Sequence, residues 1–321
     1  MQYVGIQTQQ SRNNFRSLLL LLLFPCLVIA LLFAFCYLLA MFTGNQMEET
    51  DTVQTALRLF VEMAPYVLGG VILWFIIAYF ANTSIIESAT GSRPLERKEN
   101  KRVYNLVENL CMAQGMKMPK VNIIEDDSLN AFASGINEKT YTVTLSRGII
   151  NKLNDEELEA VIAHELSHIR NHDVRLLIIS IVFVGIFAMV AQMAIRTAYY
   201  SSFSSRRNDK NNSAFLIIVL TMVVAAVGYF FSTLMRFAIS RKREYLADAG
   251  AAEMTKNPKA LANALRKISA DPDIEAVKRE DVAQLFIEHP GKQAESALSG
   301  LSGLFATHPP IEKRIQVLEQ F

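Results

Sequence analysis

The chain has 321 residues, about two domains' worth at roughly 150 residues per domain, and it is 51% hydrophobic and 20% charged. It is too apolar for a purely water-soluble protein and too charged for a purely membranous one, so the composition predicts a membrane protein with a sizeable water-exposed part. The formal net charge of +1, from 32 basic and 31 acidic residues, lacks the basic excess that a nucleic-acid-binding protein needs. Three cysteines are too few for a disulfide framework.

Four uncharged segments are long enough to cross a bilayer as helices: Leu18–Phe42, Met63–Ala81, Leu176–Ile195 and Ala214–Met235. The first is longer than the apolar region of a signal peptide and lacks a cleavage site of small residues, so we interpret it as an anchor. The last two form a candidate helical hairpin. Buried core helices of a soluble protein are the alternative interpretation.

The distribution of Lys and Arg predicts which side of the membrane each segment faces. Basic residues precede the first span and follow the second span: Arg12, Arg16, Arg93, Arg97, Lys98, Lys101 and Arg102. The connection inside this pair is mainly acidic, which predicts that the N-terminus and residues 82–175 are cytoplasmic. The connection between the third and fourth spans is basic, although this orientation would place it on the outer side of the membrane. Either that hairpin is shallow or the first pair of spans dominates the topology.

Residues 82–175 have the pattern of a mixed α/β unit. Apolar residues recur at helical spacing over Arg102–Met116, and Gly115 is placed to end that helix. The period then changes, and Val121–Ile124 indicates a strand.

A second strand is predicted at Thr140–Leu145, where threonines alternate with apolar residues. Turn-forming residues at 135–139 predict a hairpin before it. We interpret Thr140–Leu145 as an edge strand that binds a peptide by strand addition. In the alternative interpretation it only closes a small sheet.

Three further helices are predicted. Asn154 is a good N-cap, with Glu157 three residues on, for an amphipathic helix that ends near Arg170. After the fourth span, Arg241–Met254 continues helically, and Asn257-Pro258 opens another helix. Residues 287–307 have the composition of a long loop.

The helix that follows Asn154 contains His164-Glu165-Leu166-Ser167-His168. Histidines four residues apart project from one helix face, so two imidazoles can bind one metal ion while Glu165 reaches a water molecule beside it. This arrangement is typical of zinc hydrolases, which need a third protein ligand and one open position. Solvated histidines on a helix surface are the alternative interpretation.

Two residues are candidates for the third ligand. His172 lies one further turn along the helix axis, about 6 Å away, which is too far to join the other two comfortably. Glu244 is a better candidate, because Asp248 lies four residues on, on the same helix face, and can hydrogen-bond a ligand histidine. An ordinary solvated charged face is the alternative for this pair.

These motifs resemble a known family, the HtpX-type integral-membrane zinc metallopeptidases of the gluzincin type, which are relatives of the CAAX prenyl protease. The order of the motifs and the two flanking hydrophobic pairs match as well. The matching segments are Asn130–Gly135, Glu159–His168, Arg243–Asp248 and Thr307–Arg314.

The resemblance implies roles for individual residues. His164, His168 and Glu244 would bind one Zn²⁺ per chain, Glu165 would be the general base, and Asp248 would support the metal site. The resemblance also places Asn130, Ala131, Phe132 and Ala133 beside the active-site cleft, as substrate-binding residues.

The implied function is proteolytic quality control at a bacterial inner (plasma) membrane, in which misfolded or damaged membrane proteins are cleaved from the cytoplasmic side. The implied partners are those unfolded substrates and the lipid bilayer. Two other functions stay open: a prenyl-protein endopeptidase, and a non-proteolytic membrane scaffold that binds unfolded segments around a structural zinc ion.

Two residues outside the ligand set also carry predictions. His308, before two prolines, either donates a hydrogen bond to the reacting carbonyl or pins the C-terminal segment to the catalytic helix. Cys111 has no partner at zinc-site spacing and is expected in the core.

The predicted fold is a mainly α membrane protein with four transmembrane helices and a cytoplasmic α/β zincin-like catalytic domain, split by the second hairpin. The predicted divisions are 1–81 (membrane anchor), 82–175 (first part of the catalytic domain), 176–235 (second hairpin) and 236–321 (second part of the catalytic domain).

Overall fold

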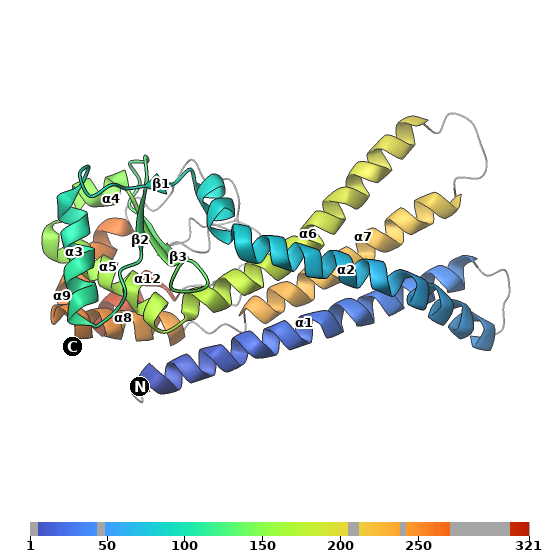
Figure 1. The fold of residues 1–321 in the computed structure, drawn as a ribbon, viewed down its shortest axis with the longest axis horizontal. Helices are drawn as coiled ribbons and strands as arrows, with labels where there is room; N and C mark the ends of the chain where they lie inside the picture. Colours follow the sequence, from blue (N-terminus) through green and yellow to red (C-terminus); the bar gives the residue numbers. More distant parts are fainter. Residues whose placement is uncertain (1–5, 44–48, 205–211, 238–241, 270–308, 321) are drawn as a thin grey trace. The chain divides into compact units, whose positions relative to one another are not determined.

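The structure, a computed structural model, describes residues 6–43, 49–204, 212–237, 242–269 and 309–320. Its internal contacts divide the chain into two units, and Figure 1 labels the helices and strands of the chain. The site unit comprises Met1–Arg16, Phe80–Ile178 and Phe237–Phe321, and the membrane unit comprises Ser17–Tyr79 and Ile179–Arg236.

Four long helices bear the predicted apolar segments: α1 (Ile6–Thr43), α2 (Glu49–Thr90), α6 (Asp173–Ser204) and α7 (Asn212–Phe237). Among the described residues, these four helices have the length and composition to cross a membrane. The candidate spans are Asn14–Phe42, Thr52–Thr90, Asp173–Thr197 and Phe215–Ser232. The prediction of a mainly α protein with four membrane helices is therefore confirmed.

The membrane unit is held together by close side-chain packing and by an interhelical hydrogen bond. The rings of Phe24 and Phe183 stack with centroids 3.9 Å apart, and the Trp74 indole N–H donates to the Val182 carbonyl at 3.3 Å. Apolar lipid supplies little hydrophobic driving force between helices, so such contacts carry helix association in a membrane.

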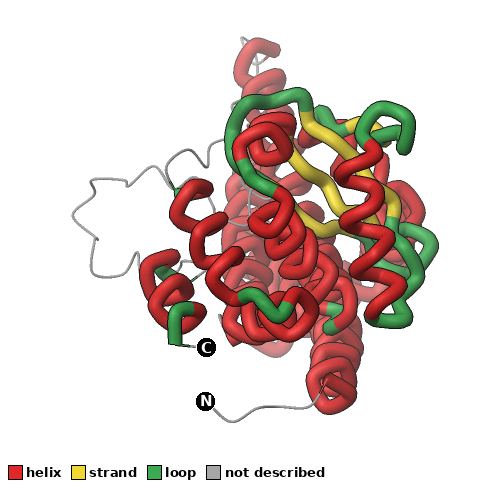
Figure 2. Tube along the Cα trace, turned by 90° about the vertical axis from the view of Figure 1, so that its left-hand side faces the viewer, coloured by secondary structure: helices red, strands yellow, loops and turns green. Residues whose placement is uncertain are grey.

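The site unit contains a four-stranded sheet of β1 (Arg93–Pro94), β2 (Lys120–Ile124), β3 (Ala131–Ser134) and β4 (Thr142–Ser146) (Figure 2). The strand order is β1-β2-β4-β3. β2 and β4 are parallel, whereas β1 pairs antiparallel with β2 and β3 pairs antiparallel with β4. β3 and β4 form a hairpin across residues 135–141, which agrees with the predicted turn.

The prediction that Thr140–Leu145 is an edge strand is wrong. β4 lies inside the sheet, between β2 and β3, and the described edge strands are β1 and β3. The alternation of threonines suggested one polar face, yet all five residues of β4 are buried. Threonine is β-branched and packs well in a central strand, so the alternating pattern did not reveal that both faces are covered.

Six described helices lie wholly within the site unit: α3 (Lys101–Ala113), α4 (Arg147–Lys152), α5 (Asp155–Arg170), α8 (Lys242–Thr255), α9 (Pro258–Ile268) and α12 (Ile311–Leu318). α5 is central, because it packs against α3, α8, α9, β3 and β4. Its predicted start is confirmed, since Asn154 and Glu157 form a complete capping box.

Local signals also end and begin neighbouring helices where expected. Gly115 follows the C-cap of α3 at φ +62°, and the Asn257 side chain caps α9. Cys111 is buried, as predicted. Residues 287–307 lie outside the described residues. The division into 1–81, 82–175, 176–235 and 236–321 stays a prediction.

Gly135, in the turn before β4, should not tolerate a side chain. Its φ is +109°, and a Cβ would lie 2.4 Å from the Thr140 carbonyl oxygen. We expect Gly135→Ala to lower the free energy of unfolding by more than the roughly 1–2 kcal/mol that a positive φ alone costs an alanine. The purified protein should show this as a lower thermal unfolding midpoint. Gly115→Ala is the matched control, because its φ is +62° and no atom lies within 4 Å of its Cβ position. Equal shifts in the two variants would refute the steric argument.

Candidate metal centre

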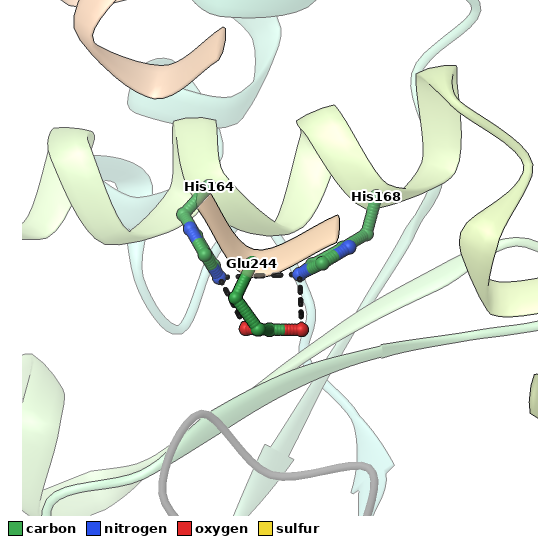
Figure 3. Close-up of side chains that lie close together, drawn as sticks. All are labelled: His164, His168 and Glu244. Atoms are coloured by element: carbon green, nitrogen blue, oxygen red, sulfur yellow. Dashed lines mark hydrogen bonds and ion pairs between the residues drawn. The ribbon is translucent and has the colours of Figure 1, made fainter. Parts of the chain in front are cut away.

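The two histidines of the sequence motif lie side by side on α5. His164 and His168 are one turn apart, and their Nε2 atoms are 3.2 Å from each other (Figure 3). Both side chains point the same way because residues at i and i+4 share one helix face. His164 is 1% exposed, so this face belongs to the interior and the interpretation as solvated surface histidines is wrong.

Glu244 reaches the histidines from α8. Its carboxylate oxygens lie 3.7 Å from each Nε2 atom, with Oε2 beside His164 and Oε1 beside His168. One ligand atom from each of the three residues lies within 4.8 Å of the others. The structure thus brings together the three residues that the sequence analysis named as zinc ligands.

α8 can approach α5 closely because its contact face consists of small residues. Ala247 and Ala251 are fully buried, and a Cβ on Gly250 would lie 2.6 Å from the Ser167 hydroxyl oxygen. A larger residue at position 250 would push the two helices apart. The short side chains therefore set the distance from which Glu244 reaches the histidines.

The spacing of these three donors suits a tetrahedral ion. Two atoms each about 2.1 Å from a tetrahedral zinc ion lie about 3.4 Å from one another. The measured separations are 3.2 Å between the two histidine nitrogens and 3.7 Å from each nitrogen to Glu244. Nitrogen and carboxylate oxygen are also donors that zinc accepts. His164, His168 and Glu244 thus fit a zinc ion by both chemistry and spacing.

Asp248 and Arg314 form a buried ion pair beside His164. Asp248 Oδ1 lies 3.0 Å from His164 Nδ1, so this carboxylate faces the ring nitrogen opposite the metal position. Arg314, from α12, donates to both Asp248 oxygens, at 2.7 and 2.9 Å. Burial raises the pKa of Asp248, but Arg314 and His164 together lower it by more, so the net shift of this pKa is downward.

The metal-free protein would hold protons where a metal would bind. Burial lowers the pKa of His168, but the Glu244 and Asp173 carboxylates raise it by more, to about 10. The pKa of His164 is raised in the same way by Asp248 and Glu244, against the opposing effect of burial. These carboxylates create a negative potential at the donor atoms, which favours a cation.

Glu165 is buried beside the ligands and is 3% exposed. Its carboxylate accepts a hydrogen bond from the backbone of Ala133, in β3. Burial raises the pKa of Glu165, and the two histidines and the Ala133 bond act in the opposite direction. A buried carboxyl group with a raised pKa beside a metal site suits general base chemistry.

Of the predicted substrate-binding residues, Asn130 directly precedes edge strand β3, and Ala131, Phe132 and Ala133 are its first three residues. All four are at most 4% exposed. The Ser146 N–H donates to the Asn130 carbonyl at 3.0 Å. Antiparallel pairing alternates, so the backbone groups of Ala131 and Ala133 lie on the side away from β4. The Asn130 side chain accepts from the Ala131 N–H at 2.9 Å.

The remaining predicted residues lie apart from the cluster or outside the description. His172 follows the end of α5 at φ 60°, and its Nδ1 lies 3.0 Å from the Asn14 side-chain oxygen. It is not one of the three clustered donors. His308 lies outside the described residues.

Sequence reasoning missed Arg314 and Asp173 as members of the site. Arg314 is 1% exposed and lies on the same helix face as Ile311 and Leu318, so a charged residue at an apolar position was the available signal. Asp173 Oδ2 lies 3.1 Å from His168 Nδ1. In the sequence, the available sign of this contact was an acidic residue five positions after His168, at the start of the next helix.

A buried His-Glu-x-x-His helix, a glutamate from a second helix and four apolar spans together define a membrane-spanning metallohydrolase. The model of the family described as "Peptidase family M48" matches residues 97–321 of the chain. The chain therefore belongs to peptidase family M48, a metallopeptidase family, and it is a multi-pass membrane protein.

Individual proteins are similar to this chain. A protein described as "Protease HtpX homolog" from Bacteroides fragilis is 77% identical over 322 residues, covering 100% of both chains. One from Listeria monocytogenes is 42% identical over 267 residues, covering 79% of this chain and 85% of its own. Among solved structures, the crystal structure of S. mikatae Ste24p aligns at 19% identity with a TM-score of 0.46, covering 79% of this chain and 58% of that one.

Loss of Arg314 should destabilise the site unit. Arg314→Met leaves Asp248 buried without its cationic partner, and breaking a buried ion pair in this way costs about 3–5 kcal/mol. Thermal unfolding in detergent, followed by the loss of helical signal, measures the change.

Arg266→Met is the matched control, because Arg266 forms an exposed ion pair with Glu319, at the end of the same helix α12. Exposed pairs contribute at most about 1 kcal/mol. A midpoint shift no larger for Arg314→Met than for Arg266→Met would contradict the role assigned to the buried pair.

Proposed function

We propose that this chain is a zinc-dependent endopeptidase of a bacterial inner membrane that cleaves misfolded or damaged membrane proteins from the cytoplasmic side. The observation that carries the proposal is the convergence of His164, His168 and Glu244 within 4.8 Å, with Glu165 buried beside them. One Zn²⁺ per chain would be held by these three donors, which leaves a fourth position open for chemistry.

The residues around the ion would divide the work of peptide hydrolysis. Zinc, when bound, supplies Lewis acidity that polarises a peptide carbonyl and acidifies water. Glu165 takes a proton from the attacking water and passes it to the leaving amine nitrogen. The Ala133 N–H holds the Glu165 carboxylate in place for both transfers. Asp248 keeps the His164 ring oriented, with Nδ1 turned away from the ion.

Edge strand β3 suits an extended peptide. The carbonyl groups of Ala131 and Ala133 lie on the side away from β4, and the Glu165 bond to Ala133 places the base at this same edge. A peptide added to a sheet edge is held mainly by main-chain hydrogen bonds, which carry little sequence preference. Such binding supports unfolded polypeptides as the substrate class, with β3 in the role first assigned to Thr140–Leu145.

The location in the membrane is supported by charge and by relatives. The basic residues that precede the first span and follow the second favour a cytoplasmic position for residues 82–175. Relatives that cover the full length or most of this chain are described as proteases and come from bacteria. Two spans separate His168 from Glu244, and an even number of crossings returns both ligands to one side.

Replacing the proposed base should abolish cleavage without loss of the metal. Glu165→Gln keeps the size of the side chain but cannot accept the proton, so we expect the cleavage rate to fall by about 10²–10⁴-fold. The measurement is hydrolysis of an unfolded model protein by the detergent-purified full chain, with zinc content determined by elemental analysis.

His168→Ala is the paired variant, because it removes a ligand and should lose zinc together with activity. Chelator treatment of the wild type should reproduce that loss, and added zinc should reverse it. Cleavage by Glu165→Gln at the wild-type rate would contradict the assignment of Glu165 as the base. If the wild type binds zinc but cleaves no unfolded or prenylated substrate, the alternative of a non-proteolytic membrane scaffold is favoured.

The orientation predicts opposite labelling of two positions. In a chain whose three cysteines are replaced, Lys98→Cys should be shielded from a membrane-impermeant thiol reagent in spheroplasts and react in inverted vesicles. Gln46→Cys, in the connection between the first two spans, should show the reverse pattern. Labelling of Lys98→Cys in spheroplasts would contradict the cytoplasmic site.

A further inference from the structure

In each ligand histidine, the ring nitrogen that points away from Glu244 faces a second carboxylate. For His164 this group is Asp248, at 3.0 Å. For His168 it is Asp173, whose Oδ2 lies 3.1 Å from Nδ1. The Asp173 side chain is 2% exposed, so this contact is in the interior and is protected from water.

A tight turn between two helices returns Asp173 to His168. α5 ends at Arg170 and α6 begins at Asp173, so only Asn171 and His172 connect them. The Asn171 N–H donates to the Ser167 carbonyl at 2.9 Å, and the His172 N–H donates to the Ile169 carbonyl at 3.1 Å.

His172 adopts a left-handed φ of 60° in this turn. Such a backbone costs a non-glycine residue about 1–2 kcal/mol. It persists only where the surrounding structure holds it. Here it allows the chain to reverse within two residues and brings the first side chain of α6 back beside the ligand.

Two further observations concern the position of Asp173. It is the first residue of α6, so the start of that helix places its side chain beside His168. Arg243, which precedes Glu244 in α8, is also near, since its Nη1 donates to the Asp173 backbone carbonyl at 3.4 Å. Asp173 therefore contacts the helices that carry all three donors.

We propose that Asp173 is the positioning residue for His168. Its carboxylate accepts the Nδ1 proton of the imidazole, which holds the ring in the tautomer whose Nε2 is directed at the metal and limits rotation of the ring. The inference rests on the metal site of the proposed function but not on peptide cleavage. The residue that orients one ligand is thus also the first residue of a candidate membrane span.

The test is the zinc affinity of the detergent-purified full chain, measured by competition with a chromophoric chelator. Carboxylates that orient metal-ligating histidines typically contribute about 10–100-fold in affinity. We expect that loss for Asp173→Ala. Asp173→Asn should lose less, because its amide oxygen still accepts from Nδ1 without the negative charge. Intact helical content of each variant is verified before titration.

Asp155→Asn is the matched control. Asp155 is the first residue of α5, so its replacement also removes an acid from the first turn of a helix. Its side chain is 74% exposed and pairs with Arg102, away from the histidines. We expect this variant to bind zinc as tightly as the wild type.

Wild-type zinc affinity in Asp173→Ala would overturn the proposal, as would an equal loss in Asp155→Asn. If Asp173→Ala does not fold, Asp173→Asn decides, and unchanged affinity in that variant would overturn the proposal. A wild type that binds zinc but cleaves no peptide would count against the proposed function while leaving this inference testable through affinity alone.

Discussion

An excess of buried negative charge is the constraint on which the site unit depends. Four carboxylates, those of Glu165, Asp173, Glu244 and Asp248, are each at most 3% exposed. Among the described residues, the buried cation Arg314 pairs with Asp248 at 2.7 Å and lies 3.8 Å from Glu244. Arg314 offsets part of this negative charge, and a divalent cation held by the histidines and Glu244 would offset more of it. Buried charges are costly unless paired, so the same excess that raises the pKa of His168 also favours metal binding.

The charges come from segments that are far apart in the chain, and α5 is where they meet. α8 brings Glu244 and Asp248, α12 brings Arg314, β3 contacts Glu165 through Ala133, and α6 begins at Asp173. The geometry of a single ion site therefore depends on several packing contacts at once. Small residues between α5 and α8 make the closest of these contacts possible, because Gly250 has no Cβ to meet Ser167.

This organisation links the chemistry to the membrane through the chain itself. The helix that supplies two donors is followed, after two residues, by a helix that has the length and composition to span a bilayer. The third donor follows the second span of that hairpin. In this order of elements, a hairpin of two candidate spans lies between the ligands, and two crossings of a membrane would return both halves of the site to one side.

The sequence by itself determined what local patterns encode. Uncharged segments revealed the four spans, the Asn154 capping box located α5, and the His-Glu-x-x-His spacing placed two imidazoles on one face. These signals lie within one or two helical turns, or within one apolar run, so they do not depend on distant residues. Glu244 was identifiable as a candidate for the same reason, because Asp248 lies one turn away.

Only the tertiary structure decided which distant groups meet. It showed that β3 rather than Thr140–Leu145 lies at the sheet edge, since a strand's place in a sheet depends on its partners. It also revealed that Arg314 pairs with Asp248 and that Asp173 faces His168. A charged residue looks the same in sequence whether it is solvated or buried. Its role is set by the packing of remote segments, which decides where charge is removed from water and must find a partner.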